Sequence, residues 1–74
     1  MKAILEFNLP DDEDEYQMAS QGAKMHHTLW EIDQWLRRNI KYAPDTINEH
    51  TYKAYEECRE QLHQFLNENN VDLG

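Results

Sequence analysis

The longest apolar pattern in the chain has the spacing of an α-helix. Between residues 11 and 42, apolar or small residues recur at intervals of three or four and fall on one stripe of a helix. They are Met18, Gly22, Met25, Leu29, Ile32, Leu36 and Ile40. Basic residues occupy the last turns, where positive charge suits the negative end of a helix, and Pro44 follows. The pattern predicts one helix over residues 11–42.

A second helical pattern occupies residues 46–69. It opens with Thr46 and Glu49, which have the spacing of a capping box. Its stripe consists of Ile47, Thr51, Tyr55, Cys58, Leu62 and Phe65, with Tyr52 and Leu66 on the flank. Residues 70–74 follow as a short tail.

The two stripes coincide if the chain turns between Ala43 and Pro44. The facing pairs are then Ile40 with Ile47, Leu36 with Thr51, Ile32 with Tyr55, Leu29 with Cys58, Met25 with Leu62, and Gly22 with Phe65. This register predicts a close helix contact at Gly22, a local kink being the alternative, and a buried Cys58. The sequence therefore predicts an antiparallel two-helix hairpin.

Residues 1–10 have a different period. Ala3, Leu5, Phe7 and Leu9 alternate with other residues, as in a half-buried strand, and Pro10 ends the pattern. No second strand is predicted to pair with it. We expect either an extended arm packed across the helices or a strand paired with its copy in another subunit.

The fold class is thus mostly α, a single domain over residues 1–74 with an N-terminal strand or arm. A chain of 74 residues buries only about 60% of its unfolded surface. One seam between two helices also leaves aromatic residues on the flanks uncovered. We therefore expect dimerisation to complete the fold, as a four-helix bundle.

The charge limits the classes of partner. The chain has 15 Asp and Glu against 7 Lys and Arg, a formal net charge of -8. Binding to nucleic acid or to an anionic membrane requires positive charge, so we expect neither. The lone cysteine, the lack of a long apolar run and an N-terminus unlike a signal peptide indicate a cytoplasmic protein.

No motif for catalysis or for cofactor binding is present. The chain has no phosphate-binding loop or nucleophile elbow and is too short to enclose a substrate pocket, so we expect no enzyme. His27 and Glu31 have ligand spacing, but Cys58 and His63 project from different sides of their helix, so we expect no metal site. We therefore predict no cofactor and no catalytic residue.

Asp33 lies beside the apolar stripe of the first helix. We expect it to pair with Arg37 at i+4 and to act as a polar device that fixes the register of the bundle. An acid–base pair with His26 is disfavoured, because seven residues of helix separate the two by about 10 Å.

Acidic residues gather in two places. Asp11, Asp12, Glu13, Asp14 and Glu15 form a continuous run, in which Asp11 is a candidate N-cap. Glu56 and Glu60 belong to a row on the outer face of the second helix, which Lys53 and Arg59 interrupt. These acids are interpreted either as helix caps and solvated faces or as a surface that imitates DNA.

The chain resembles small acidic proteins of tailed bacteriophages. The resemblance rests on residues 4–10, on the stretch Leu29–Arg37 with Lys41 and Tyr42, and on residues 52–62. It implies a phage product in the host bacterial cytoplasm that binds a host or phage protein. We expect a non-enzymatic interaction module that inhibits or modulates a host defence or nucleic-acid-processing protein.

Two alternatives accompany this interpretation. One is a DNA-mimic inhibitor that acts through its acidic surface, and the other is a homo-oligomeric structural accessory of phage replication. The candidate interaction residues are the aromatic residues Trp30, Trp35 and Tyr52 together with Asp11, Asp12, Glu13, Asp14, Glu15, Glu56 and Glu60.

Overall fold

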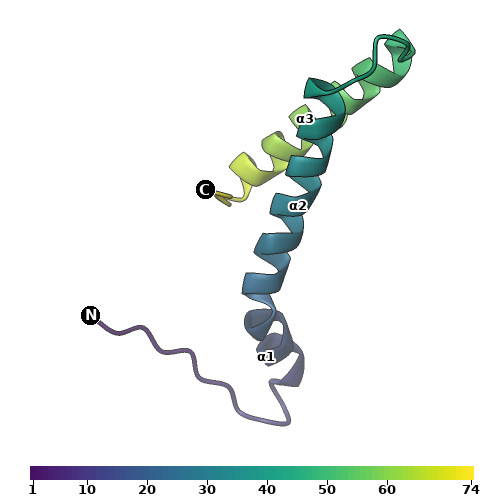
Figure 1. Cartoon of the computed structure of the whole chain (residues 1–74). Helices are drawn as coiled ribbons and strands as arrows, with labels where there is room; N and C mark the ends of the chain where they lie inside the picture. The colour runs from purple at the N-terminus through teal and green to yellow at the C-terminus, as the bar shows by residue number, and fades with distance from the viewer.

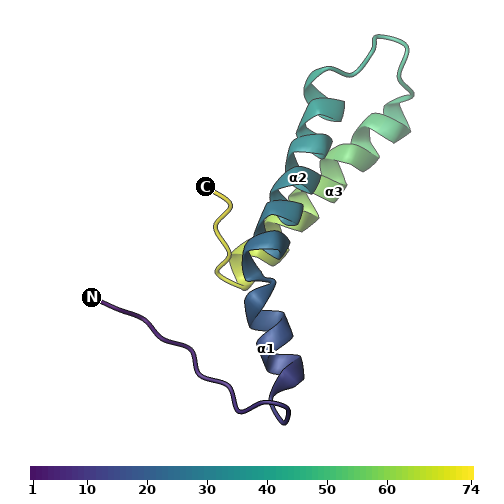
Figure 2. The same ribbon diagram turned by 60° about the horizontal axis from the view of Figure 1, so that its bottom comes forward.

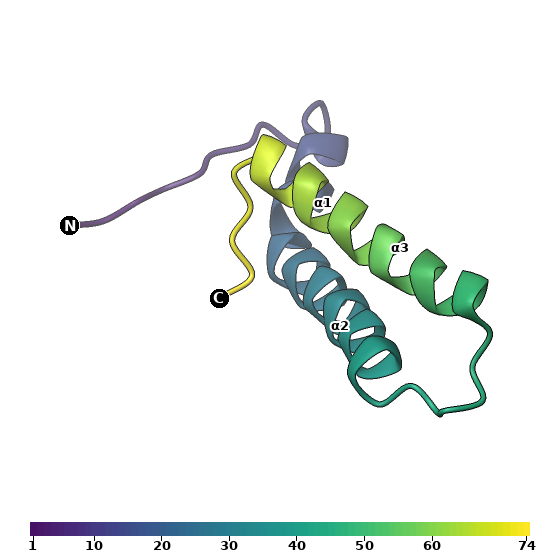
Figure 3. The same cartoon turned by 90° about the horizontal axis from the view of Figure 1, so that it is seen from above.

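The chain folds into three helices and has no strand. A computed structural model, which describes residues 1–74, places α1 at Glu13–Ser20, α2 at Gly22–Lys41 and α3 at Glu49–Glu68 (Figure 1). α2 and α3 run antiparallel and lie side by side, joined by residues 42–48 (Figure 3). The mostly helical class and the helical hairpin are therefore confirmed.

The predicted first helix is interrupted. α1 ends at Ser20 and α2 begins at Gly22, although backbone bonds from Gln21 N to Gln17 O (3.1 Å) and from Met25 N to Gln21 O (2.9 Å) bridge the break. Ser20 Oγ donates to Gln17 O, and serine and glycine together favour a kink. A Cβ at Gly22 would meet nothing within 4 Å. The predicted close contact at Gly22 is wrong, and the alternative, a local kink, is what the structure contains.

The second helix begins later than predicted. Asn48 is the N-cap of α3, and its Oδ1 accepts a hydrogen bond of 2.8 Å from His50 N. The capping box from Thr46 to Glu49 does not form, because Thr46 lies in a turn closed by Ile47 N and Pro44 O. Asparagine is a stronger N-cap than threonine, so the helix starts from the better cap.

The predicted register is wrong. Tyr55 packs edge-on against Trp35 rather than facing Ile32, and Asp33 contacts Arg59 and His63. The residues of α3 that are not exposed are Tyr52, Tyr55, Arg59, Leu62 and Leu66. Opposite them, α2 turns inward Leu29, Asp33, Leu36 and Ile40. We call these nine residues the seam; Gln34 and Asn39, which are also half-buried, flank it on α2.

The seam buries little. Only Asp33, Leu36 and Leu66 are buried, while Cys58, predicted to be buried, is exposed. The molecule measures 55 × 28 × 19 Å with a radius of gyration of 17.5 Å, whereas a globular chain of this length has about 11 Å. The chain is therefore elongated, with one layer of contact between its helices.

Residues 1–8 form an arm that points away from the helices (Figures 1 and 2). Ile4 and Leu5 are each 77% exposed, so the prediction that the arm packs across the helices is wrong. Its attachment is local, since the Phe7 ring lies edge-on to Tyr16 and Asn8 N donates to the Asp12 carboxylate at 2.8 Å. Pairing of the arm with a second copy remains a prediction.

The N-cap predicted for the first helix is also displaced. Asp12, rather than Asp11, precedes α1, and no side chain caps the amides of its first turn. Those amides lie beside the carboxylates of Glu13, Asp14 and Glu15, which favour the positive end of a helix.

The C-terminal tail folds back toward α2. Asn70 has a positive φ of 56°, and Val71 N donates to Leu66 O at 2.8 Å. This is a Schellman-type ending, which asparagine tolerates better than other side-chain-bearing residues. The reversal brings the Asp72 carbonyl 2.7 Å from His26 Nε2. The tail thus connects the end of α3 to the first turns of α2.

Replacing Gly22 by alanine tests the origin of the break. Because a Cβ at this position is free of contacts, we expect Gly22→Ala to raise helicity and to increase the free energy of unfolding by up to about 1 kcal/mol. Far-UV circular dichroism and urea unfolding measure both quantities. The neighbouring Ala23→Gly is the matched control and should change both in the opposite direction. Unchanged helicity in both variants would contradict a helix on either side of Gln21.

Candidate interaction surfaces

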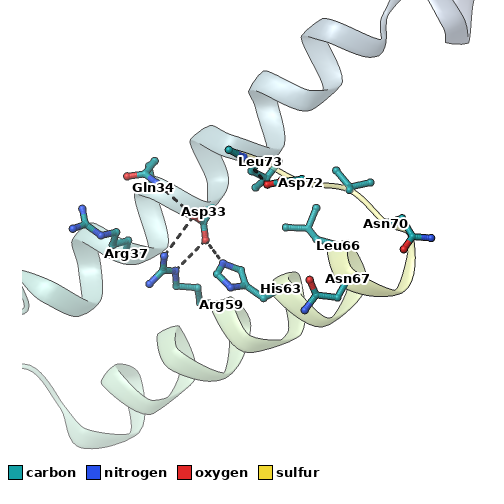
Figure 4. Close-up of a pocket in the computed structure, with 12 residues that line it drawn as sticks. Asp33, Gln34, Arg37, Arg59, His63, Leu66, Asn67, Asn70, Asp72 and Leu73 are labelled. Carbon is teal, nitrogen blue, oxygen red and sulfur yellow. Dashed lines mark hydrogen bonds and ion pairs between the residues drawn. The ribbon is translucent and has the colours of Figure 1, made fainter.

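A charged cluster lies at the centre of the seam. Arg59 Nε donates to Asp33 Oδ1 at 3.0 Å, and His63 Nε2 lies 2.6 Å from the same oxygen (Figure 4). Arg59 Nη2 and Gln34 Nε2 each approach Asp33 Oδ2 at 3.5 Å. Both carboxylate oxygens of Asp33 therefore have donors, as a residue only 7% exposed requires.

The donors keep Asp33 ionised. Burial alone raises the pKa of Asp33, but the hydrogen bonds and positive charges of Arg59 and His63 together outweigh burial and hold that pKa below its ordinary value. Asp33 and Arg59 carry opposite charges across the seam, so sliding one helix along the other would separate them. The cluster is consistent with the predicted device that fixes register.

The partners of Asp33 differ from those predicted. Arg37 makes no ion pair with Asp33, because the bonds that Asp33 accepts come from α3 and from Gln34. The Arg37 side chain instead points away from Asp33 (Figure 4) and lines a groove. His26 is held by the tail through Asp72, so the disfavoured acid–base pair of His26 and Asp33 does not form.

The groove beside this cluster is polar and open. It has a volume of about 700 Å³ and lies between α2, the end of α3 and the tail. Asp33, Arg37, Arg59 and His63 line it together with Asn67 and Asn70. Arg59 and His63 already contact Asp33, so most of the charged side chains that line the groove have partners within the chain. The groove therefore contributes mainly to the packing of the chain.

The two tryptophans lie on different sides of α2. Trp30 is 42% exposed and stacks on His27, whereas Trp35 is 49% exposed and contacts Tyr55. Tyr52 is half-buried in the seam. The structure therefore leaves Trp30 and Trp35 available as anchors on separate surfaces, while Tyr52 is largely used in packing α3 against α2.

The predicted acidic residues also fall into two places. Residues 11–15 lie at the α1 end of the molecule, where all but Asp12 are exposed. Glu56 and Glu60 lie on α3 around a smaller groove that also includes Arg59 and His63. The two acidic groups do not form one continuous surface, and cations accompany the second.

Arg59 and His63 were not among the predicted site residues. The signal that would have found Arg59 is the spacing of Tyr52, Tyr55, Arg59, Leu62 and Leu66, which follows a heptad as closely as the stripe chosen from apolar residues. A single acid on one seam and a single base on the other indicate a charged pair. The register that places these complementary charges opposite one another is the one found in the structure.

The other chemical candidates remain isolated. His27 Nε2 lies 3.3 Å from Glu31 Oε1, with both side chains exposed, and no three His, Cys, Asp or Glu side chains gather as a metal site requires. None of the three helices combines the length and apolarity that a membrane-spanning segment requires.

Comparison with protein-family models, with curated proteins and with solved structures found no match to the chain.

Substituting Asp33 measures the strength of the central cluster. We expect Asp33→Asn to lower the free energy of unfolding by about 1–3 kcal/mol, because it leaves Arg59 without its counter-ion. Urea unfolding at a fixed protein concentration measures this loss. Asp45→Asn, in the exposed loop, is the control and should stay within about 0.5 kcal/mol of the parent. A double variant, Asp33→Leu with Arg59→Met, should recover most of the stability, since a packed apolar pair replaces the ions.

The same carboxylate predicts a pH dependence. Because the folded pKa of Asp33 lies below its unfolded value of 3.8, its stabilising effect is present above that value and is lost as pH falls through the folded pKa. The difference in unfolding free energy between the parent chain and Asp33→Asn should therefore shrink as pH falls from 6 toward 3. Taking the difference cancels the titration of the other acids. A difference independent of pH would contradict a lowered pKa of Asp33 in the folded chain.

Proposed function

We propose that the protein is a non-enzymatic protein–protein interaction module. The observation that carries this proposal is the imbalance between exposed and buried apolar residues. Twelve large apolar side chains are exposed, whereas only Leu36 and Leu66 are buried among the apolar residues. Such exposure is far beyond what a monomer needs for its own fold and is typical of surfaces that other proteins cover.

The proposed target-binding residues lie at the α1 end and on one side of α2. Ile4 and Leu5 expose their side chains along the arm, and Leu9 exposes its own in the turn directly before the acids 11–15. An apolar arm followed by negative charge suits a partner with an apolar pocket and a basic rim, in which charge accelerates association and apolar contact supplies affinity. Trp30 adds a half-exposed aromatic anchor on the α2 surface.

The resemblance to small acidic phage proteins supports a class of target. A host defence or nucleic-acid-processing protein commonly has a basic surface, which the acids 11–15 would approach favourably. Binding such a protein would inhibit or modulate it without chemistry.

Imitation of DNA is the second candidate function. It is favoured by the exposure of Asp11, Asp14 and Glu15, none of which forms an ion pair within the chain. Two continuous rows of negative charge would be needed to follow a duplex. Because Glu56 and Glu60 are separate from this run and lie beside cations, the interaction module is better supported.

Capture of partners from infected bacterial cells tests the proposal. A tag at the C-terminus leaves the arm free, and bound proteins are quantified by mass spectrometry for the parent chain and its variants. We expect a partner whose binding survives about 0.5 M salt and falls at least about tenfold in Trp30→Ala. Tyr42→Ala, which removes an exposed aromatic residue elsewhere, is the matched control.

A second variant set separates the two functions. Converting residues 11–15 to Asn and Gln should slow association with the proposed partner, while a DNA mimic should lose its target entirely and be displaced by DNA. A partner that is lost in 0.5 M salt and is indifferent to Trp30→Ala would favour imitation of DNA. If no protein is enriched by the parent chain over Trp30→Ala, the interaction module is wrong.

A further inference from the structure

The hairpin has two broad faces of opposite character. In each helix, the residue before a seam residue lies about 100° around the helix axis from it. Because the two helices are antiparallel, these preceding residues point to the same side of the hairpin. These residues are Thr28, Ile32, Trp35, Asn39, Thr51, Ala54, Cys58, Gln61 and Phe65. None of them carries a charge, and we call this surface the neutral face.

The residues that follow each seam residue form the other side. They are Trp30, Gln34, Arg37, Lys41, Lys53, Glu56, Glu60, His63 and Asn67. Five of the nine carry a full charge, in a chain where charged residues make up 30% of the total. The open groove beside Asp33 includes Arg37 and His63 and lies on this side. A second groove lies on the neutral face, where Trp35, Asn39 and Thr51 line it and Arg38 adds one charge from outside that face.

The neutral face is apolar where it is most exposed. Ile32 is 44% exposed, Phe65 is 55% exposed, and Trp35 contributes about half of its indole surface. These three residues belong to the stripes predicted from sequence or flank them. The rotation that brings Asp33 and Arg59 into the seam leaves Ile32 and Phe65 outside it. The chain therefore has more apolar surface than one helix contact uses.

The exposed area indicates how much of this surface is left to be covered. The chain exposes 6619 Å², whereas a compact monomer of 8.9 kDa exposes about 4,800 Å². The arm accounts for part of the excess of about 1,800 Å². A stable homodimer removes about 1,000–2,500 Å² from each protomer. The excess thus has the size that one obligate dimer contact would bury.

We propose that the neutral face is an isologous interface, on which a second copy of this chain packs to form a four-helix bundle. The face is suited to itself in two ways. None of its nine residues carries a charge, despite the net charge of -8. It also presents bulky Ile32 and Trp35 on α2 and small Ala54 and Cys58 on α3, so α2 of one protomer fits against α3 of the other.

A charge placed on this face tests the interface. Light scattering of the parent chain at micromolar concentration should give twice 8.9 kDa. Cys58→Arg should weaken the dimer at least about 30-fold, because each protomer buries an unpaired cation. Gln64→Arg adds the same charge on the outer side of α3 and should change the dimer affinity less than about threefold. Arginine lowers the net negative charge in both variants, so general repulsion cannot explain a loss.

Tryptophan fluorescence gives a second readout that does not depend on a disruptive variant. In Trp30→Phe the only indole is Trp35, and its emission should shift to longer wavelength as dilution separates the protomers. In Trp35→Phe, which keeps Trp30 on the charged side, emission should not change over the same range. A helical monomer of 8.9 kDa at 100 µM, or a dimer equally tolerant of Cys58→Arg and Gln64→Arg, would overturn the proposal.

The interface and the proposed target-binding residues are separable. A monomer that still captures a partner through Trp30 would refute only the interface. A dimer that captures nothing would refute only the interaction module.

Discussion

The contact between Asp33 and Arg59 is the constraint on which the rest of the structure depends. Two antiparallel helices joined by one loop can slide and rotate against one another with little change in apolar burial, since Leu36 and Leu66 are the only buried apolar residues here. Burial of two such side chains stabilises the hairpin by only about 3–6 kcal/mol. An ion pair tolerates neither movement, because either one would strand a charge. His63 on the same carboxylate strengthens that restriction.

The position of this ion pair explains which helix faces remain outside. Bringing Asp33 and Arg59 together turns Ile32, Trp35 and Phe65 away from the seam and onto the neutral face. The same rotation places Arg37 and His63 at the rim of the polar groove. One polar contact thus determines both the uncharged surface and the charged one.

Much of the fold could be predicted from the sequence. The periods of three and four residues predicted both helices and the turn near Pro44, because local spacing and proline chemistry act without tertiary context. The break at Gln21 was foreseen only as an alternative, since Gly22 has the same sequence signature whether it permits a close contact or a kink. The start of α3 depended on a competition between the Thr46 and Asn48 caps, which sequence spacing alone does not rank.

The register and the exposure of the candidate residues were harder to predict from the sequence, for one physical reason. Apolar spacing places the whole stripe of each helix in one helix contact. This assumption fails where a helix has two neighbours, or one neighbour and an uncovered side, because the apolar stripe is then wider than the seam. For this reason Cys58, predicted to lie in the seam, is exposed, and Leu66, predicted to lie on the flank, is buried. Trp30 and Trp35 remained plausible anchors because aromatic side chains at flank positions stay accessible under either register.

The small number of buried residues also affects how the chain unfolds. Because only Asp33, Leu36 and Leu66 are buried, we expect unfolding to expose little additional apolar surface, with a small heat-capacity change and a weak dependence on denaturant. We also expect a broad thermal transition in which the α1 end loosens before the seam, because the break at Gln21 separates it from the hairpin. In the dimer proposed above, cooperativity would be gained through association rather than built into a single chain.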